Sequence, residues 1–300
     1  MSRVVFVLTP QVHLLDLAGP AQVFSTADGY ELFYVAEASP VPTWQGVALH
    51  ASLAWPALAP DDLVLVPGWR DGFGAFGSAT LRMIKEHHEA GGTVASVCAG
   101  ADALGRAGLL DGRRCTTHHD LQDALALDYP DAVVVRDVLY VGDDRVVTSA
   151  GIASGIDLAL HLVAQRHGPA AAARVAREMV VYARRNGDEP QASAMLRHRA
   201  HLSDVVHRVQ DRIDADFAST LPLAGLAAGA GVSERTLTRL FAAATGRTPL
   251  RYQQLLRVER AEYLIGHGST VDAAARAVGF VDARMLRRLR SASTTSTTRS

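Results

Sequence analysis

The 300-residue chain has only two cysteines, a single lysine (Lys85) and no long run of apolar residues. Two cysteines are too few to cross-link a chain of this length, which excludes a fold held together by disulfides. Such low cysteine content favours a reducing compartment. No apolar stretch reaches the roughly 18 residues of a membrane-spanning helix, and the first residues lack the pattern of a signal peptide. The sequence therefore predicts a cytoplasmic protein without a membrane partner.

Composition and charge point to two domains with different tasks. Hydrophobic residues make up 48% of the chain and charged residues 20%, so sizeable cores can form. The overall net charge of −1 divides into −6 for residues 1–187 and +5 for residues 188–300. A basic half favours an anionic partner such as nucleic acid. The alternative is that arginine merely replaced lysine, with no functional meaning.

The first half alternates short β-branched segments with segments of helical spacing. This alternation predicts an α/β fold, namely a flavodoxin-like, mostly parallel sheet sandwiched by helices. We expect strands at 4–8, 30–36, 63–66, 93–97, 133–136 and 146–149, and helices at 14–24, 78–90, 101–107 and 152–165.

The pattern changes after residue 183, where a polar segment contains both glycine and proline. We interpret 1–183 as one domain, 184–200 as a linker and 201–290 as an all-α domain. The Ser/Thr-rich segment 291–300 is expected to be a disordered tail.

The helical half contains an internal repeat. Residues 226–231 recur as 274–279, and residues 233–240 recur as 282–289. Each copy has a helix, a glycine turn and a second helix with a capping residue at its start, which is the pattern of a helix-turn-helix. The second helices present polar side chains on one face, where they could enter a major groove: Arg235, Thr238, Arg239, Arg284, Arg287 and Arg288. The competing interpretation is a helical bundle with a solvated arginine face.

Residues 202–290 resemble the AraC/XylS family of bacterial transcription regulators. The similarity is carried by the string 226–241, by Thr245-Gly-Arg-Thr-Pro249 and by Tyr252. It implies that both motifs bind successive major grooves of double-stranded promoter DNA through the six residues named above. The second motif departs from the family pattern, because an aromatic residue is expected where Arg290 stands. The usual closing Gly-Pro-Tyr segment is also absent.

A possible reactive site lies at Cys98, where a strand runs through a small-residue turn into a helix. Such an elbow presents a nucleophile, and the helix dipole is expected to favour the thiolate. Asp16 is the candidate acid, and His118 or His119 the candidate base. The alternative for a lone cysteine after a buried strand is an inert core residue. Asp16 and Cys98 both follow strands, so both are expected at the carboxyl edge of the sheet.

Residues 3–180 resemble the ThiJ/PfpI family of the class I glutamine amidotransferase-like superfamily. The similarity rests on the segments 15–20, 65–68, 97–100, 107–113, 116–118 and 148–152. Joined to an AraC-type domain, this is the architecture of the GlxA-like regulators, which implies a sensing and dimerising role. Enzymatic relatives such as isocyanide hydratases commonly have threonine after the cysteine, where this chain has Ala99.

The predicted function is a sequence-specific DNA-binding transcription regulator that acts as a homodimer and senses a small molecule. Asp16, Cys98, Ala99 and His118 are predicted to form the ligand pocket or a vestigial catalytic site, and no cofactor or metal is predicted. One alternative is a cysteine-dependent hydrolase or isocyanide-hydratase-like enzyme with a degenerate DNA-binding domain. Another is a redox sensor in which Cys98 is oxidised to a sulfenic acid.

Overall fold

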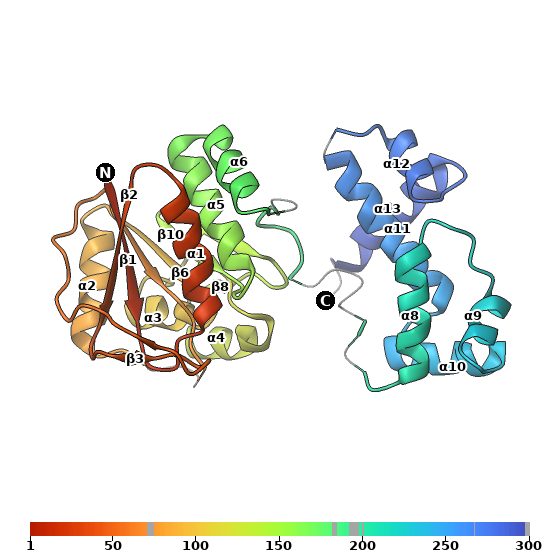
Figure 1. Ribbon diagram of the computed structural model, residues 1–300, viewed down its shortest axis with the longest axis horizontal. Coiled ribbons are helices and arrows are strands. Elements are labelled where there is room, and N and C mark those ends of the chain that lie inside the picture. The colour runs from red at the N-terminus through yellow and green to blue at the C-terminus, as the bar shows by residue number, and fades with distance from the viewer. Residues whose placement is uncertain (71–74, 182–184, 192–197, 200, 267, 298–300) are drawn as a thin grey trace. The chain divides into compact units, whose positions relative to one another are not determined.

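The computed structural model describes residues 1–70, 75–181, 185–191, 198–199, 201–266 and 268–297, the last seven by their backbone alone. The chain divides into two compact units, Met1–Gln191 and Ala192–Ser300. The first holds the sheet and the second is helical (Figure 1). Each unit is described by itself below.

A six-stranded sheet forms the centre of the first unit, with strand order β2-β1-β5-β6-β10-β9. The first five strands in this order are parallel, and only β9 runs antiparallel. The predicted α/β class with a mostly parallel sheet is therefore confirmed. The strands are β1 Ser2–Leu8, β2 Tyr30–Ala36, β5 Leu63–Val66, β6 Thr93–Val97, β9 Tyr140–Asp143 and β10 Val146–Ser149.

Helices cover both faces of this sheet because successive residues of its central strands are apolar, so both faces have to be buried. In β1, Phe6 belongs to a core with α1, α5 and α6, whereas Val5 and Val7 belong to a second core with α2, α3 and α4. The layering follows from side chains of one strand pointing to opposite faces. The helices are α1 Leu14–Thr26, α2 Ser78–Glu89, α3 Gly100–Arg106, α4 Gln122–Asp128, α5 Ser154–His167 and α6 Pro169–Glu178, with a 3-10 turn at His119–Leu121.

The smaller sheets depart from the expected pattern. Residues 133–136 were expected as one strand, but only Val133–Val134 (β8) is a strand, and it pairs with Arg114–Cys115 (β7) outside the main sheet. A further short pair joins Val41–Pro42 (β3) to Ala48–Leu49 (β4). The six-stranded sheet also contains β9, which the sequence did not predict. Its glycine and aspartate lower the strand propensity of this segment.

The second unit contains two helix-turn-helix motifs, α9–α10 and α12–α13, with α11 between them. Each motif has its own apolar core, and α11 contributes Tyr252 and Leu256 to the first and Val258 and Ala261 to the second. The helices are α8 Asp204–Asp216, α9 Leu223–Gly229, α10 Glu234–Thr245, α11 Pro249–Gly266, α12 Val271–Ala277 and α13 Ala283–Thr297.

Two segments differ from the sequence-based division of the chain. The backbone of α13 continues to Thr297, into the segment expected to be a disordered tail, and residues 298–300 lie outside the described residues. Residues 185–191, expected as the start of the linker, pack on the first unit, where the Leu139 amide donates to the Gly187 carbonyl at 2.8 Å.

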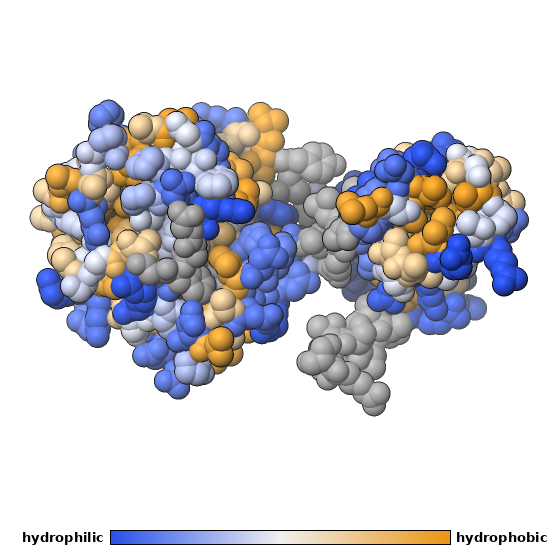
Figure 2. Space-filling model, turned by 90° about the horizontal axis from the view of Figure 1, so that it is seen from below, coloured by the Kyte–Doolittle hydropathy of each residue, from blue (hydrophilic) through white to orange (hydrophobic). Residues whose placement is uncertain are grey.

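Apolar residues on the surface are broken up by polar ones. Figure 2 shows hydrophobic groups interspersed with hydrophilic residues on one face of each unit. Within the described part of the chain, no helix is long and apolar enough to cross a membrane.

We predict that Gly100→Ala destabilises the first unit strongly. A Cβ at Gly100 would lie 2.1 Å from the Val66 carbonyl oxygen, so α3 and β5 would have to separate. We expect a loss of about 3 kcal/mol or more in the free energy of unfolding, measured in urea. The matched change Gly142→Ala meets nothing within 4 Å and should cost less than about 1 kcal/mol. Equal losses in the two variants would contradict this account.

Candidate sensor pocket and nucleic-acid interface

Cys98 lies on a sharp elbow between β6 and α3. Its backbone has φ +56°, a left-handed conformation that is rare for residues with a side chain. Two hydrogen bonds hold it: the Cys98 amide donates to the Ser149 carbonyl at 3.0 Å, and the Thr117 hydroxyl donates to the Cys98 carbonyl at 2.8 Å. The expected elbow is therefore present, fixed by the neighbouring strand β10 and by Thr117.

Asp16 lies beside Cys98 because α1 and α3 both begin just beyond the carboxyl edge of the sheet. Oδ1 of Asp16 accepts a hydrogen bond from the Ile152 amide at 2.7 Å, and Oδ2 is buried without a hydrogen-bond partner among the described residues. A Cβ at Gly68 would lie 2.4 Å from Asp16 Oδ2 and 2.6 Å from Cys98 Cβ. Gly68 thus brings the two side chains together, and buried Ala99 follows directly.

Burial controls the ionisation of this pair. Desolvation raises the pKa of Asp16 to about 6, against the opposing effect of hydrogen bonds to its charged form. Desolvation and the charge of Asp16 raise the pKa of the Cys98 thiol above its ordinary value. The expected activation of Cys98 as a thiolate is therefore wrong, because these effects outweigh the helix dipole. The seven-residue α3 cannot offset the loss of water and the nearby carboxylate.

A cavity of about 190 Å³ lies next to the elbow. Gly151 separates it from Cys98, since a Cβ there would lie 3.0 Å from the sulfur. His118 lines this cavity, and burial together with His119 lowers the pKa of His118, which favours its neutral form. We call this cavity the elbow pocket; it is lined by His118, His119, Leu139, Ala150, Gly151, Ile152, Ala153, Ser154, Arg185 and Gln191.

The structure thus brings Asp16, Cys98 and Ala99 together and places His118 at the adjoining pocket. The sequence did not indicate Arg185 or Gln191 as lining residues, because both belong to a polar segment with no recognisable motif.

The residues around His118 also form a small cluster of metal-binding types. Ligand atoms of His118, His119 and Asp120 lie within 4.8 Å of one another. His119 and Asp120 are exposed, and Asp120 already pairs with His119 at 2.9 Å. We assign no metal to this cluster.

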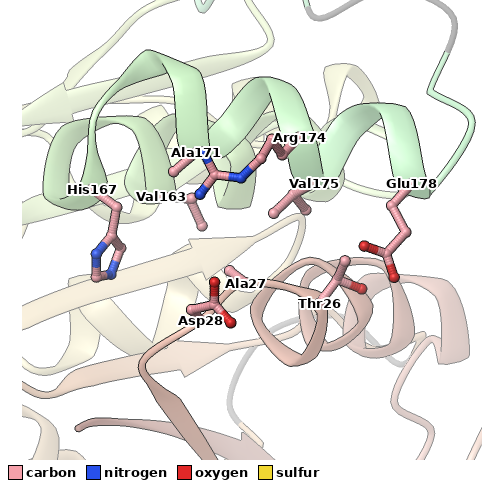
Figure 3. A pocket seen from close by; sticks show the side chains of 9 residues that line it. All are labelled: Thr26, Ala27, Asp28, Val163, His167, Ala171, Arg174, Val175 and Glu178. Atoms are coloured by element: carbon pink, nitrogen blue, oxygen red, sulfur yellow. The ribbon is translucent and has the colours of Figure 1, made fainter.

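A larger cavity of about 390 Å³ lies between the end of α1 and the helices α5 and α6. In Figure 3, Arg174 and Glu178 extend from α6 towards Asp28 and Thr26 on the other side. All three charged side chains are exposed, so water screens them, and none of the predicted residues Asp16, Cys98, Ala99 and His118 lines this cavity. Of these four residues, His118 lines the elbow pocket, and Gly151 of the same lining adjoins Cys98. We therefore place the candidate sensor site at the elbow pocket.

The first helix-turn-helix motif presents the predicted residues on the outer face of α10. Ser233 caps this helix by accepting from the Thr236 amide at 3.2 Å. Leu237 is fully buried, whereas Arg235 and Arg239 are exposed. Thr238 is half-buried and its hydroxyl donates to the Glu234 carbonyl, leaving its methyl group and an oxygen lone pair for a ligand.

The second motif has the same arrangement on α13. Asp282 caps the helix by accepting from the Arg284 amide at 2.8 Å, and Leu286 is fully buried. Arg284, Arg287 and Arg288 are exposed. At the position where the sequence led us to expect an aromatic residue, Arg290 forms an ion pair with Glu262 of α11, with Nε and Oε1 3.4 Å apart.

Arg257 of α11 connects the two motifs. Its guanidinium donates to the carbonyls of Phe217 at 2.7 Å, Ser219 at 2.8 Å and Gly279 at 3.0 Å. Gly279 is the turn residue of the second motif, and a Cβ there would lie 1.9 Å from the Ala218 carbonyl oxygen. The segment 217–219 and the second turn are therefore tightly joined, which fixes α12–α13 relative to α8.

An α/β domain with a pocket beside a buried Cys–Asp pair, followed by two helix-turn-helix motifs, defines a DNA-binding transcription regulator with a sensing domain. Residues 2–165 match the sequence pattern of the DJ-1/PfpI family, and residues 226–297 match a helix-turn-helix domain. The chain belongs to the DJ-1/PfpI family.

Two relatives that match most of this chain are named regulators. The chain is 28% identical to the HTH-type transcriptional regulator GbdR of Pseudomonas aeruginosa, covering 92% of this chain and 77% of that one. It is 29% identical to the regulator CdhR of the same species, covering 77% and 68%. It is also 36% identical to the isonitrile hydratase of Pseudomonas putida, but over only 54% of this chain and 71% of the enzyme.

Solved structures support the fold of the first unit. A ThiJ/PfpI family protein from Pseudomonas syringae aligns over 77% of this chain and 90% of its own, with a TM-score of 0.56 and 22% identity. An AraC family transcriptional regulator from Pseudomonas putida aligns over 60% of this chain and all of its own, with a TM-score of 0.54 and 22% identity.

We predict that the stability of the protein falls as pH rises through the titration of Asp16. The folded-state pKa of about 6 lies above the ordinary value of 3.8, so between these values the folded state binds more protons than the unfolded state. Asp16→Asn removes this loss. Its unfolding free energy should gain about 3 kcal/mol relative to the wild type between about pH 3.5 and pH 7.

The measurement is urea unfolding across this pH range, with Asp111→Asn at an exposed site as the matched control. The control should follow the wild-type profile. If the unfolding free energies of Asp16→Asn and the wild type differed by the same amount at every pH, Asp16 would not be protonated preferentially in the folded state.

Proposed function

We propose that the protein is a cytoplasmic, homodimeric regulator that binds specific promoter sequences and responds to a small molecule in the elbow pocket. The observation that carries this proposal is the pair of matching recognition helices, α10 and α13. Each buries its leucine side and leaves arginines exposed on the other.

The exposed arginines suit sequence-specific contact with DNA. An arginine on a helix in the major groove can donate two hydrogen bonds to one guanine, and arginines elsewhere on the face can hold phosphates. The hydrogen bonds of Arg257 support simultaneous binding of both motifs to DNA, because they hold the second motif against the end of α8. The relatives named HTH-type transcriptional regulators support the same role.

The elbow pocket supports binding of a small, polar molecule rather than turnover. Its volume of about 190 Å³ suits a compact metabolite, and its lining combines imidazole, guanidinium and amide groups with small apolar side chains. A cysteine hydrolase needs an accessible thiolate, whereas burial and Asp16 keep the Cys98 thiol protonated.

A second copy of this chain is the proposed occupant of an apolar groove on the first unit. The groove measures about 390 Å³ and lies along α1 and the edge strand β2, with Leu14, Leu17, Ala18, Leu32 and Tyr34 among its lining residues. Ser52 already pairs with Tyr34 and Ala36 along the edge of β2. The apolar lining of the groove is therefore the feature that suits it to self-association. Dimerisation would bring four recognition helices to one DNA segment.

We predict that Arg235→Ala and Arg284→Ala each weaken binding to DNA from the protein's own upstream region. Loss of one base contact should raise the dissociation constant by about 10- to 100-fold and relax the sequence preference at the contacted position. Binding is measured by fluorescence anisotropy at several salt concentrations. The matched control Arg208→Ala changes an exposed arginine of α8 and should have an effect below about threefold. Wild-type binding that does not depend on sequence would overturn the proposed function.

We predict that Ala18→Arg converts the dimer into a monomer. Ala18 is exposed in the groove, so a buried guanidinium without a partner would oppose association. Sedimentation velocity reports the change directly. The matched control Leu127→Arg replaces an apolar residue that is 80% exposed outside the groove and should remain dimeric. A dimer that persists in Ala18→Arg would place the interface elsewhere.

A further inference from the structure

The segment 185–191, which we call the strap, is fastened to the first unit at its beginning by an ion pair. The Arg185 side chain donates to Asp157 Oδ2 through Nε at 3.1 Å and through Nη2 at 2.5 Å, and the Arg185 amide donates to Oδ1 at 3.1 Å. Asp157 is 3% exposed. Because one buried carboxylate receives three donors from Arg185, this attachment is specific as well as electrostatic.

The middle of the strap is fastened through its backbone. The Gly187 carbonyl accepts from the Leu139 amide at 2.8 Å and from the Tyr140 amide at 3.3 Å. A Cβ at Gly187 would lie 2.6 Å from the Tyr140 carbonyl oxygen, so this close approach requires glycine. The strap therefore closes onto the start of β9.

The end of the strap is fastened by Gln191. Its backbone amide donates to Asp137 Oδ1 at 3.0 Å. Its side-chain amide donates to the carbonyls of Thr117 at 2.9 Å and Val138 at 3.1 Å. Thr117 is the residue whose hydroxyl holds the Cys98 carbonyl. One residue thus joins the strap to the elbow and to the segment before β9.

Arg185 and Gln191 also line the elbow pocket. Two of the three attachment points of the strap are therefore part of the pocket wall. A molecule in the pocket meets the same side chains that hold the strap in place, so its binding changes attachment to the extent that it contacts the attached and released forms differently.

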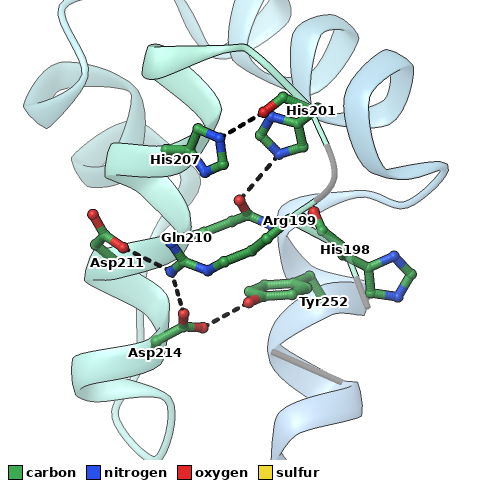
Figure 4. A network of polar contacts seen from close by, with 8 residues as sticks. All are labelled: His198, Arg199, His201, His207, Gln210, Asp211, Asp214 and Tyr252. Atoms are coloured by element: carbon green, nitrogen blue, oxygen red, sulfur yellow. Dashed lines mark hydrogen bonds and ion pairs between the residues drawn. The ribbon is translucent and has the colours of Figure 1, made fainter. Parts of the chain in front are cut away.

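The chain is fastened again where the second unit begins (Figure 4). Arg199 donates to Asp211 at 2.7 Å and to Asp214 at 2.5 Å, and Asp214 also accepts from the Tyr252 hydroxyl at 2.7 Å. Gln210 donates to the His198 carbonyl at 2.8 Å. Both ends of the connection are thus anchored, and residues 192–197 join them.

We propose that attachment of the strap sets the length of the linker, and that the elbow pocket controls DNA binding through it. This inference rests on the proposed function. With the strap attached, the six residues 192–197 lie between the two anchors; its release adds the seven residues 185–191 to this length, which makes thirteen. Effective concentration in a dimer on two half-sites falls roughly as the −3/2 power of linker length, so release should weaken such binding about threefold.

The test compares Gln191→Ala and Asp157→Asn with the wild type, using the full-length protein. Hydrogen exchange at the Leu139 and Tyr140 amides, which donate to Gly187, reports attachment of the strap. We expect both amides to exchange at least about tenfold faster in each variant. Gln165→Ala, at an exposed glutamine of α5, is the matched control and should leave exchange unchanged.

DNA binding is then measured with two fragments selected by the wild-type protein, one with two half-sites and one with a single half-site. We expect about threefold weaker binding of the two-site DNA in both variants and unchanged binding of the single-site DNA. Faster amide exchange with wild-type affinity for the two-site DNA would overturn the proposal. Unchanged exchange in both variants would also overturn it, since these contacts would then not hold the strap.

A third variant tests the connection to the pocket. Ala153 is exposed and lines the pocket, so Ala153→Phe places a ring there, with Ala153→Ser as the matched control. We expect exchange at Leu139 and Tyr140 to change by about threefold or more, with two-site affinity falling if exchange rises and rising if it falls. No change in either would show that the pocket does not control the strap. Failure of the wild type to bind DNA selectively would count against the proposed function instead.

Discussion

The sensor domain depends on the close approach of backbone segments around Cys98. Gly68 and Gly151 both lie where a Cβ would come within 2.6 Å of Cys98 Cβ, and Gly100 lies where one would strike β5. Because these three residues are glycines without side chains, the elbow, α1 and the start of α5 can converge at one edge of the sheet. This convergence brings Asp16 to the thiol and leaves the elbow pocket beside it. A larger residue at any of these glycines would push the segments apart.

The same convergence removes water from two acidic groups at once. Burial raises the pKa of Asp16 to about 6, and burial together with the Asp16 carboxylate raises the pKa of Cys98, so near neutral pH a protonated thiol lies beside an ionised carboxylate. A protonated thiol is a weak nucleophile, and Gly151 separates this one from the elbow pocket. The geometry of a nucleophilic elbow is thus retained in an electrostatic setting that favours binding.

Local pattern predicted much of the fold and part of the site. The repeat of 226–231 at 274–279 identified both helix-turn-helix motifs, since turn glycines and capping residues act within a few positions. The parallel arrangement placed Asp16 and Cys98 at one edge because both follow strands. The pKa of Cys98, the strand β9 and the attachment of Gln191 could not be predicted this way. The pKa of Cys98 and the attachment of Gln191 depend on residues distant in sequence, Asp16 and Thr117, whereas the glycine and aspartate of β9 lower its strand propensity.

The polar segment before the helical domain shows why composition misleads at such a boundary. Glycine, proline and charged residues predict a solvated linker, yet Gly187 is required by a close contact and Arg185 by a buried carboxylate. Arg199 has a similar role in the second unit, where its side chain donates hydrogen bonds to two aspartates of α8. Since Arg257 joins the end of α8 to the second turn, any change in how the chain enters α8 acts on both motifs together. The two described ends of the connection are therefore held by arginines on carboxylates, and the length between these ends is what we propose a bound molecule alters.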